Sequence, residues 1–238
     1  MNKAITTVSV ASVRTSNSDK AEMMTQLLFG ESVEILDTKK DWWKIKSHYD
    51  GSEGWVDAKQ LVAISDEDFA ERTTEIITER VLYYNHKEEQ FLLSIGSEVV
   101  RENPVEPVPE DLRQTIMQMA LGFLNVPYLW GGRSFFGVDA SGFVQIIYKA
   151  NGIKLPREAA QQVEYGEVLD FVEEAEAGDL AFFENEDGKI THTGIMLENQ
   201  EVIHAYGKVR IDVLDSIGIF NKDLNKHTHK LRFIKKIL

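Results

Sequence analysis

The chain has 238 residues, 43% of them hydrophobic and 27% charged, which suits a folded globular protein of one large domain or two to three small ones. Its 26 basic and 39 acidic residues give a formal net charge of −13, which argues against nucleic acid and anionic membranes as partners, because phosphate binding needs clustered Lys and Arg. There is no cysteine, so disulfides, thiolate metal sites and cysteine chemistry are excluded.

Neither an export signal nor a membrane span is visible in the sequence. Residues 1–18 contain no apolar core of the length found in signal peptides. No later run approaches the roughly 18 apolar residues of a membrane span. We therefore expect a cytoplasmic protein, or an exported one if a signal has been removed by processing. The sequence gives no indication of the oligomeric state.

The first part of the chain, residues 1–63, is predicted to form a small β-barrel. Short β-branched and apolar runs alternate there with polar turns. The alternation at residues 32–36 and 43–46 has the period of half-buried strands, and the glycine-containing stretch 49–54 predicts a turn. Several short strands joined by polar turns are typical of a small barrel.

A second, degenerate copy of this module is predicted at residues 64–103. Short strands are expected at residues 75–77, 81–84 and 91–95, and residues 96–100 (GSEVV) echo residues 30–34 (GESVE). The following residues, 104–110, hold three of the five prolines and predict a stiff, extended linker.

The third part, residues 111–238, is predicted to hold helices followed by strands. Asp111 can cap a first helix. A second helix fits residues 140–151, with Asp139 or Ser141 at its start and Gly152 just past its end. Helices followed by an antiparallel sheet predict the α+β class. The expected strands are residues 179–183, 191–197, 202–206, 209–213 and 231–238.

The start of the second helix and two of the strands carry the candidate chemistry. A helix N-terminus presents free N–H groups and a partial positive charge, which lowers the pKa of a cysteine placed there and favours the thiolate nucleophile. Position 140 lies at such a helix start. His192 and His204 lie on consecutive strands that a short turn at residues 198–201 can bring side by side. One histidine could act as the base and the other could orient it.

Four segments in this order resemble the NlpC-type peptidases, bacterial papain-like cysteine peptidases that act on cell-wall peptides: residues 127–134, 137–144, 192–195 and 202–205. Ser12-Val13-Arg14, Gly30-Glu31 and Gly54-Trp55-Val56 resemble the bacterial SH3-like domain. The combination is similar to γ-D-glutamyl-L-diamino-acid endopeptidases. The resemblance implies an α+β papain-like domain at 111–238, with helices packed on an antiparallel sheet. One or two SH3-like barrels, at 1–63 and 64–103, would precede it.

Carried over position by position, the resemblance puts Ala140 at the nucleophile site, His192 as the general base and His204 as the orienting third residue. Asp139 and Ser141 flank the nucleophile and in relatives help to bind substrate. The implied reaction is hydrolysis of the γ-D-Glu–diamino-acid amide bond in peptides such as L-Ala-γ-D-Glu-diaminopimelate. No cofactor is implied.

Three further positions are implied to contact substrate. Trp130 would line the cleft, although a buried core tryptophan is the alternative. In relatives the SH3-like module reads the free amino terminus of L-Ala-γ-D-Glu, and Glu22 and Tyr49 are the candidates for that acidic and aromatic pair. Tyr49 can also be an ordinary loop aromatic, and Asp139 can be a helix cap alone.

The chain departs from the family pattern at the nucleophile, where cysteine is expected and Ala140 stands. Alanine cannot form an acyl-enzyme, and Ser141 points about 100° away on a helix. Two explanations remain open: the cysteine was replaced to trap substrate, or the natural protein is a pseudoenzyme that binds cell-wall peptides. Acyl transfer or amidase chemistry on another bond is a third possibility.

The other four histidines, His48, His86, His227 and His229, are expected to be ordinary surface or hydrogen-bonded residues. His227 and His229 could share one face of a strand and suggest a metal site. No third ligand lies near them in the sequence, so no metal is expected.

Overall fold

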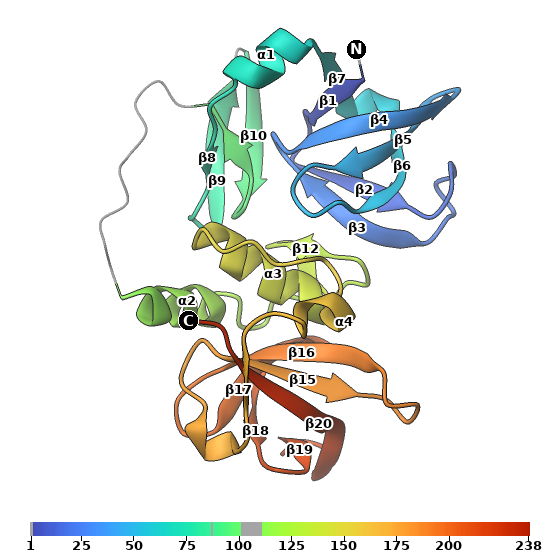
Figure 1. The fold of residues 1–238 in the computed structure, drawn as a ribbon. Coiled ribbons are helices and arrows are strands. Elements are labelled where there is room, and N and C mark those ends of the chain that lie inside the picture. The colour runs from blue at the N-terminus through green and yellow to red at the C-terminus, as the bar shows by residue number, and fades with distance from the viewer. Residues whose placement is uncertain (1, 87, 101–110) are drawn as a thin grey trace. The chain divides into compact units, whose positions relative to one another are not determined.

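Figure 1 shows the chain as a computed structural model, which describes residues 2–86, 88–100 and 111–238. The linker predicted at residues 104–110 lies outside the described residues. The chain divides into two compact units. The first unit comprises Met1–Val108 with Trp130–Phe136, and the second comprises Pro109–Leu129 with Gly137–Leu238.

The first unit contains a seven-stranded antiparallel sheet in the order β3-β2-β6-β5-β4-β1-β7. Alternate side chains of these strands point inward, as in the burial of Ala11 and Val13 on β2, because successive residues of a strand face opposite sides. The strands expected at residues 32–36 and 43–46 are confirmed in β4 and β5. The strands are β1 (Lys3–Thr6), β2 (Val10–Arg14), β3 (Met23–Leu28), β4 (Ser32–Lys39), β5 (Trp42–Ser47), β6 (Glu53–Asp57) and β7 (Leu61–Ile64), with a 3₁₀ turn η1 (Ala58–Gln60) before β7.

The following residues form a smaller substructure with its own apolar cluster. Helix α1 (Asp66–Glu71) is capped by Ser65, whose hydroxyl accepts from the backbone N–H of Asp68. Two antiparallel pairs follow it: β8 with β11 and β9 with β10. Ile77, Leu93 and Val99 form the buried centre of the cluster. The strands are β8 (Glu75–Ile76), β9 (Val81–His86), β10 (Glu89–Ser94) and β11 (Glu98–Val99).

The segment Trp130–Phe136, with β12 (Arg133–Ser134), also belongs to the first unit. Arg133 is buried there and its Nη1 forms an ion pair with Oε2 of Glu31 at 2.8 Å. The same Nη1 donates to the backbone carbonyl of Gln26, whose side chain accepts from the backbone N–H of Arg133. Gly131 has a φ of +73°, and a Cβ there would lie 2.7 Å from the carbonyl oxygen of Met23. The backbone approach at this position therefore requires glycine.

The second unit is built on a seven-stranded antiparallel sheet in the order β14-β20-β15-β16-β17-β18-β19, and β20 also pairs with β19. The five strands expected in this part are present. Two short strands of this sheet, β14 and β19, are additional, and the last strand begins five residues earlier than the expected 231. The strands are β14 (Glu167–Leu169), β15 (Leu180–Glu184), β16 (Ile190–Met196), β17 (Glu201–Tyr206), β18 (Lys208–Leu214), β19 (Gly218–Asn221) and β20 (Lys226–Lys236).

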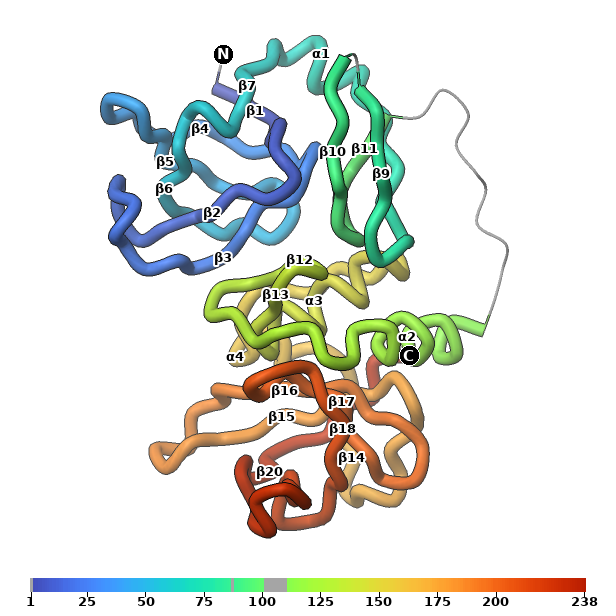
Figure 2. Tube along the Cα trace, turned by 180° about the vertical axis from the view of Figure 1, so that it is seen from behind, coloured from blue at the N-terminus to red at the C-terminus, as the bar shows by residue number. Residues whose placement is uncertain are grey.

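Helices cover one side of this sheet, as Figures 1 and 2 both show. The predicted helix at 140–151 is confirmed as α3 (Ala140–Ala150), which packs on β16 and β17. Every residue of α3 up to Lys149 is buried. Helices on an antiparallel sheet confirm the α+β class. The other elements are α2 (Leu112–Leu121), β13 (Gly137–Val138), α4 (Ala159–Gln162) and the 3₁₀ turn η2 (Val172–Glu174).

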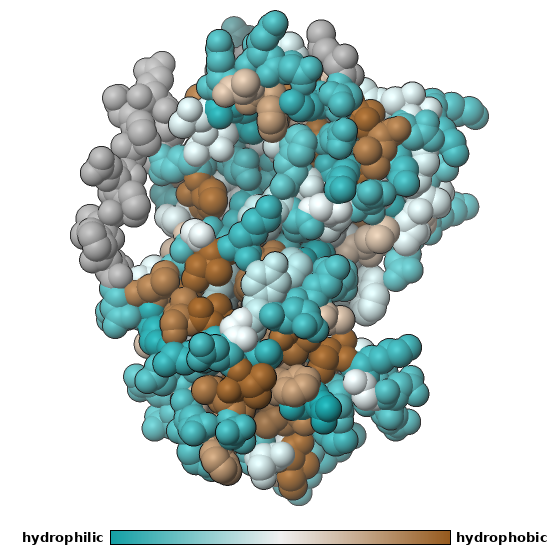
Figure 3. Space-filling view, in the orientation of Figure 1, coloured by the Kyte–Doolittle hydropathy of each residue, from teal (hydrophilic) through white to brown (hydrophobic). Residues whose placement is uncertain are grey.

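The surface of the second unit keeps some apolar side chains. Figure 3 shows them gathered in patches on the visible face. Phe171 and Ile217 are among the exposed large hydrophobic residues of this unit. Within the described part of the chain, no helix is long and apolar enough to cross a membrane.

Candidate active site

The N-terminus of α3 carries the position predicted for a nucleophile. Ala140 is the first residue of the helix, and Asp139 is its N-cap, with φ −92° and ψ 179°. Oδ1 of Asp139 accepts a hydrogen bond from the backbone N–H of Gly142 at 2.7 Å. The cap fixes the start of the helix, where backbone N–H groups are free to face a ligand. The side chain at this point is a methyl group with no acid–base or nucleophilic capacity.

Arg157 holds the two residues that flank Ala140. Its Nη2 lies 2.5 Å from Oδ2 of Asp139, and its Nη1 contacts Oδ1 of Asp139 at 3.0 Å and Oγ of Ser141 at 2.9 Å. The Arg157 side chain is only 3% exposed, so this two-pronged ion pair is shielded from water. Asp139 is thus both a cap and the partner of a buried cation. The sequence pattern does not single out Arg157, because its partners lie 16 and 18 residues away.

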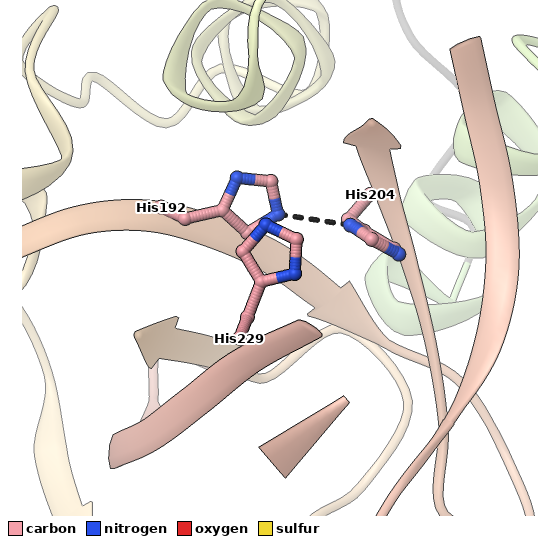
Figure 4. A group of neighbouring side chains, drawn as sticks. All are labelled: His192, His204 and His229. Atoms are coloured by element: carbon pink, nitrogen blue, oxygen red, sulfur yellow. Dashed lines mark hydrogen bonds between the residues drawn. The ribbon is translucent and has the colours of Figure 1, made fainter. Parts of the chain in front are cut away.

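The two predicted histidines meet on neighbouring strands. Nε2 of His192 on β16 lies 2.8 Å from Nδ1 of His204 on β17, as the dashed line in Figure 4 shows. Gly194 pairs with His204 across the two strands. A Cβ at Gly194 would lie 3.0 Å from Cβ of His204 and 2.7 Å from Cγ2 of Val202. The glycine of the His-Thr-Gly motif therefore lets β17 approach closely beside His192.

Behind His204 lies a carboxylate that the sequence reasoning missed. Oδ2 of Asp212 on β18 lies 3.0 Å from Nε2 of His204. Arg210 in turn donates to both oxygens of Asp212, from Nε at 2.6 Å and from Nη2 at 2.8 Å. In the strand register His204 pairs with Arg210, and Val202 pairs with Asp212. Alternate polar residues at 210 and 212 in the expected strand 209–213 were the available signal, but only the register shows that they lie behind His204.

Burial keeps both histidines neutral. Desolvation, with smaller contributions from His229 and His204, lowers the pKa of His192 well below its usual value. Desolvation also lowers the pKa of His204, although the hydrogen bond to Asp212 opposes it. For Asp212, burial acts to raise the pKa, but hydrogen bonds from His204 and Arg210 outweigh it and hold the pKa below the usual value. Asp212 is therefore an ionised acceptor for the neutral ring of His204.

This protonation pattern defines the tautomers. Since Asp212 can only accept, Nε2 of the neutral His204 carries its proton and Nδ1 carries a lone pair. That lone pair accepts from Nε2–H of His192, which leaves the lone pair of His192 on Nδ1. Figure 4 shows Nδ1 of His192 on the side of the ring that faces a helix of the same unit. The arrangement suits a general base oriented by a second ring and a carboxylate.

A third histidine completes the cluster, although the sequence analysis expected it to be an ordinary surface or hydrogen-bonded residue. His229 on β20 stacks on His192, with ring centroids 4.1 Å apart and an interplanar angle of 24°. It also meets the edge of His204 at 5.6 Å between centroids. Burial, with a smaller contribution from the neighbouring His204, lowers the pKa of His229 to about 4. His227, two residues earlier, instead pairs with Asp215 at 2.8 Å.

The remaining predicted site residues, Trp130, Tyr49 and Glu22, belong to the first unit. Trp130 is 62% exposed, so the alternative of a core tryptophan is wrong. The Tyr49 ring lies under the guanidinium of Arg133, with 5.4 Å from Cζ to the ring centroid. Glu22 is exposed and precedes β3. Their contact with substrate stays a prediction.

The comparisons with known proteins agree with these features. The model of the NlpC/P60 family matches residues 125–228, and the model of the bacterial dipeptidyl-peptidase SH3 domain matches residues 13–61. The chain is 31% identical to a γ-D-glutamyl-L-lysine dipeptidyl-peptidase of Bacillus subtilis, over 77% of this chain and 72% of the relative. It is 30% identical to the protein of the same name from Bacillus cereus, over 80% of this chain and 68% of the relative.

A solved structure shares the fold. The crystal structure of an NlpC/P60 family protein from Bacillus cereus superposes with a TM-score of 0.81, at 23% identity, over 99% of both chains. The predicted resemblance is thus confirmed, including an SH3-like region ahead of the papain-like one. The chain belongs to the NlpC/P60 family of peptidoglycan-related peptidases and carries a bacterial dipeptidyl-peptidase SH3 domain before its NlpC/P60 domain.

Proposed function

We propose that this chain binds cell-wall peptides of the form L-Ala-γ-D-Glu-diamino acid and, because Ala140 stands at the nucleophile position, does not cleave them. The diamino acid would be L-lysine or meso-diaminopimelate. The names of the two Bacillus relatives support the first. The proposal includes its converse: a thiol at position 140 would make the site a peptidase for the γ-D-Glu–diamino-acid bond.

The observation that carries the proposal is a base that is oriented and neutral in a site without a nucleophile. His192, His204 and Asp212 form a continuous hydrogen-bonded chain, and the cap at Asp139 is intact. These intact contacts support a site that can still hold a peptide amide.

With a cysteine at position 140, each residue would have a defined role. The helix start would favour the thiolate, and His192 would take the thiol proton on Nδ1. The thiolate would attack the γ-carbonyl of D-Glu, while the backbone N–H of residue 140 stabilises the oxyanion. His192 would return the proton to the leaving amine of the diamino acid. Water would then hydrolyse the thioester and release L-Ala-γ-D-Glu.

Ser141 does not replace the missing thiol. Its Oγ accepts from Arg157 and contacts Oδ1 of Asp139 at 3.4 Å. A hydroxyl that accepts a hydrogen bond from a guanidinium is a poorer nucleophile, because the hydrogen bond occupies a lone pair of the hydroxyl oxygen. We propose that Asp139 and Ser141 contact the peptide instead. Trp130, Tyr49 and Glu22 remain the candidates for the free amino terminus of L-Ala.

The test is a cleavage assay by mass spectrometry on L-Ala-γ-D-Glu-L-Lys and L-Ala-γ-D-Glu-meso-diaminopimelate. We expect no release of L-Ala-γ-D-Glu by the chain as it stands and release by the Ala140→Cys variant. Ala140→Cys combined with His192→Gln is the matched control and should be inactive, since it keeps the thiol but lacks the base.

Binding is measured separately by calorimetry on the unaltered chain. Saturable binding of one of the two peptides supports the proposal. If a folded Ala140→Cys variant leaves both peptides intact and the unaltered chain binds neither, the proposal is wrong. An alanine codon at position 140 in the source gene would show that the binding form is the natural one.

A further inference from the structure

Three imidazole rings from three different strands converge in the second unit. His192 comes from β16, His204 from β17 and His229 from β20. Each ring offers one nitrogen to a group whose atoms all lie within 4.8 Å of one another. Figure 4 shows one nitrogen of each ring on the side that faces the other two rings. The peptidase chemistry uses only His192 and His204, so the position of His229 is unexplained by it.

The outer nitrogens of two of these rings are already held. Nε2 of His204 contacts Asp212 at 3.0 Å, which leaves Nδ1 facing the group. Nδ1 of His229 contacts Oγ1 of Thr228 at 2.9 Å, which leaves Nε2. Protein metal sites fix their histidines in the same way, with the second ring nitrogen bonded to a carboxylate or another polar group. The pattern beside Asp212 is the carboxylate–histidine pair of many zinc sites.

We propose that His192, His204 and His229 bind one divalent transition-metal ion of the zinc type. Three neutral imidazoles suit Zn²⁺, Co²⁺, Ni²⁺ or Cu²⁺, whereas Mg²⁺ and Ca²⁺ require oxygen ligands. Three protein ligands leave a fourth position for water, as in zinc sites that remain open. The chain has no cysteine, so no thiolate competes for the ion.

Metal entry requires a defined rearrangement. Nitrogens around a tetrahedral zinc lie about 3.3 Å apart, so the widest separation of 4.8 Å must shrink by roughly 1.5 Å. The stacked rings of His192 and His229 must splay so that both lone pairs point at one centre. The hydrogen bond between His192 and His204 is lost, and the proton on Nε2 of His192 moves to Nδ1. Since Nδ1 is the basic atom of the peptidase site, metal binding and base function exclude each other.

The test uses the full chain without a histidine tag, stripped with a chelator and then titrated with Co²⁺ alone. We expect one equivalent to bind with the visible absorption of tetrahedral cobalt, and Zn²⁺ to displace it. Replacing an outer partner, as in Asp212→Asn, should weaken binding on the order of 10–100-fold. His229→Gln removes a ligand and should weaken it more.

His227→Gln is the matched control, because it removes a histidine two residues away on the same strand that pairs with Asp215 instead. It should bind Co²⁺ as the unaltered chain does. His229→Phe keeps an aromatic ring on His192 and serves as the second variant if His229→Gln does not fold. Absence of one saturable equivalent, or binding that His229→Phe leaves unchanged, overturns the inference. No peptide is present in this test, so its failure leaves the proposed function standing.

Discussion

Asp212 illustrates how one carboxylate defines the protonation of a whole site. It is the terminal acceptor behind His204, and its side chain is 2% exposed. Because an ionised carboxylate accepts and cannot donate, it fixes the proton of His204 on Nε2 and, through it, the lone pair of His192 on Nδ1. Asp212, which fixes the tautomer of the base His192, thus lies two hydrogen bonds away from it.

We therefore expect Asp212→Asn to lower the activity of the Ala140→Cys variant by roughly 10²-fold or more in kcat, with a small change in KM. The asparagine amide can donate to Nε2 of His204, which would turn both rings to the wrong tautomer. The measurement is steady-state peptide cleavage as a function of pH. Asp223→Asn is the control, because Asp223 also pairs with Arg210 but its side chain is 75% exposed. Equal loss in both variants would mean that Arg210, rather than the tautomer, matters.

At the residue scale the sequence identifies the two central histidines but not their surroundings. His192 and His204 could be predicted because their segments resemble those of the NlpC-type peptidases, and a short turn joins their strands. Asp212 could not be predicted, because only the register of β17 with β18 shows that it lies behind His204. Arg157 could not be predicted either, because it lies in the segment after α3 and contacts residues at the start of that helix. His229 could not either. Its strand, β20, is the last strand of the chain and pairs with both β15 and β19.

Among the elements, the start of α3 differs from an ordinary helix start. Asp111 and Asp139 are the N-caps of α2 and α3: the Asp111 side chain accepts from the backbone N–H groups of Arg113 and Gln114, and the Asp139 side chain accepts from that of Gly142. Asp111 is exposed, whereas the Asp139 side chain is 15% exposed and paired with Arg157. Removing Asp139 therefore deletes a cap and also leaves a cation buried without its carboxylate.

From this difference we expect Asp139→Ala to lower the free energy of unfolding by about 3–5 kcal/mol, and Asp111→Ala by about 0.5–2 kcal/mol. Chemical denaturation followed by circular dichroism measures both. Arg157→Met in the Asp139→Ala background should recover part of the loss, because it removes the buried charge that has lost the Asp139 carboxylate. Similar losses from Asp139→Ala and Asp111→Ala would show that Arg157 finds water or another partner.

The start of the last strand is not predicted by the sequence pattern. Residues 226–230 read Lys-His-Thr-His-Lys, with no apolar alternation to indicate a strand, so the sequence predicts the last strand only from residue 231. In the structure β20 begins at Lys226 because β19 offers a pairing edge. The extra residues place His229 beside His192. The polar first half of β20 is a strand because it pairs with β19, and this pairing cannot be predicted from its own sequence.

On the scale of the whole molecule, the family and the α+β class could be predicted, whereas the division into units could not be read from the order of residues. Trp130–Phe136 lies between two stretches of the second unit in the sequence and belongs to the first unit in space. Burial of Arg133 against Glu31 contributes to this placement, and nothing in the local sequence marks either residue as buried. Long-range ion pairs of this kind have no short-range pattern.

The Arg133–Glu31 pair allows a test of how the first unit retains this segment. Both side chains are 1% exposed, and Oε2 of Glu31 also accepts from the backbone N–H of Leu28. Arg133→Met should cost about 3–5 kcal/mol of unfolding free energy, because it leaves the Glu31 carboxylate buried without its cation. The double variant Arg133→Met with Glu31→Gln should lose markedly less, since the neutral amide can keep a hydrogen-bonding role without a charge.

Denaturant unfolding followed by tryptophan fluorescence compares the unfolding free energies of the single and double variants. The exposed pair of Lys44 and Glu53 is the control, and Lys44→Met should cost at most about 1 kcal/mol. Equal losses in the single and double variants would show that the pair anchors the segment by shape rather than by charge.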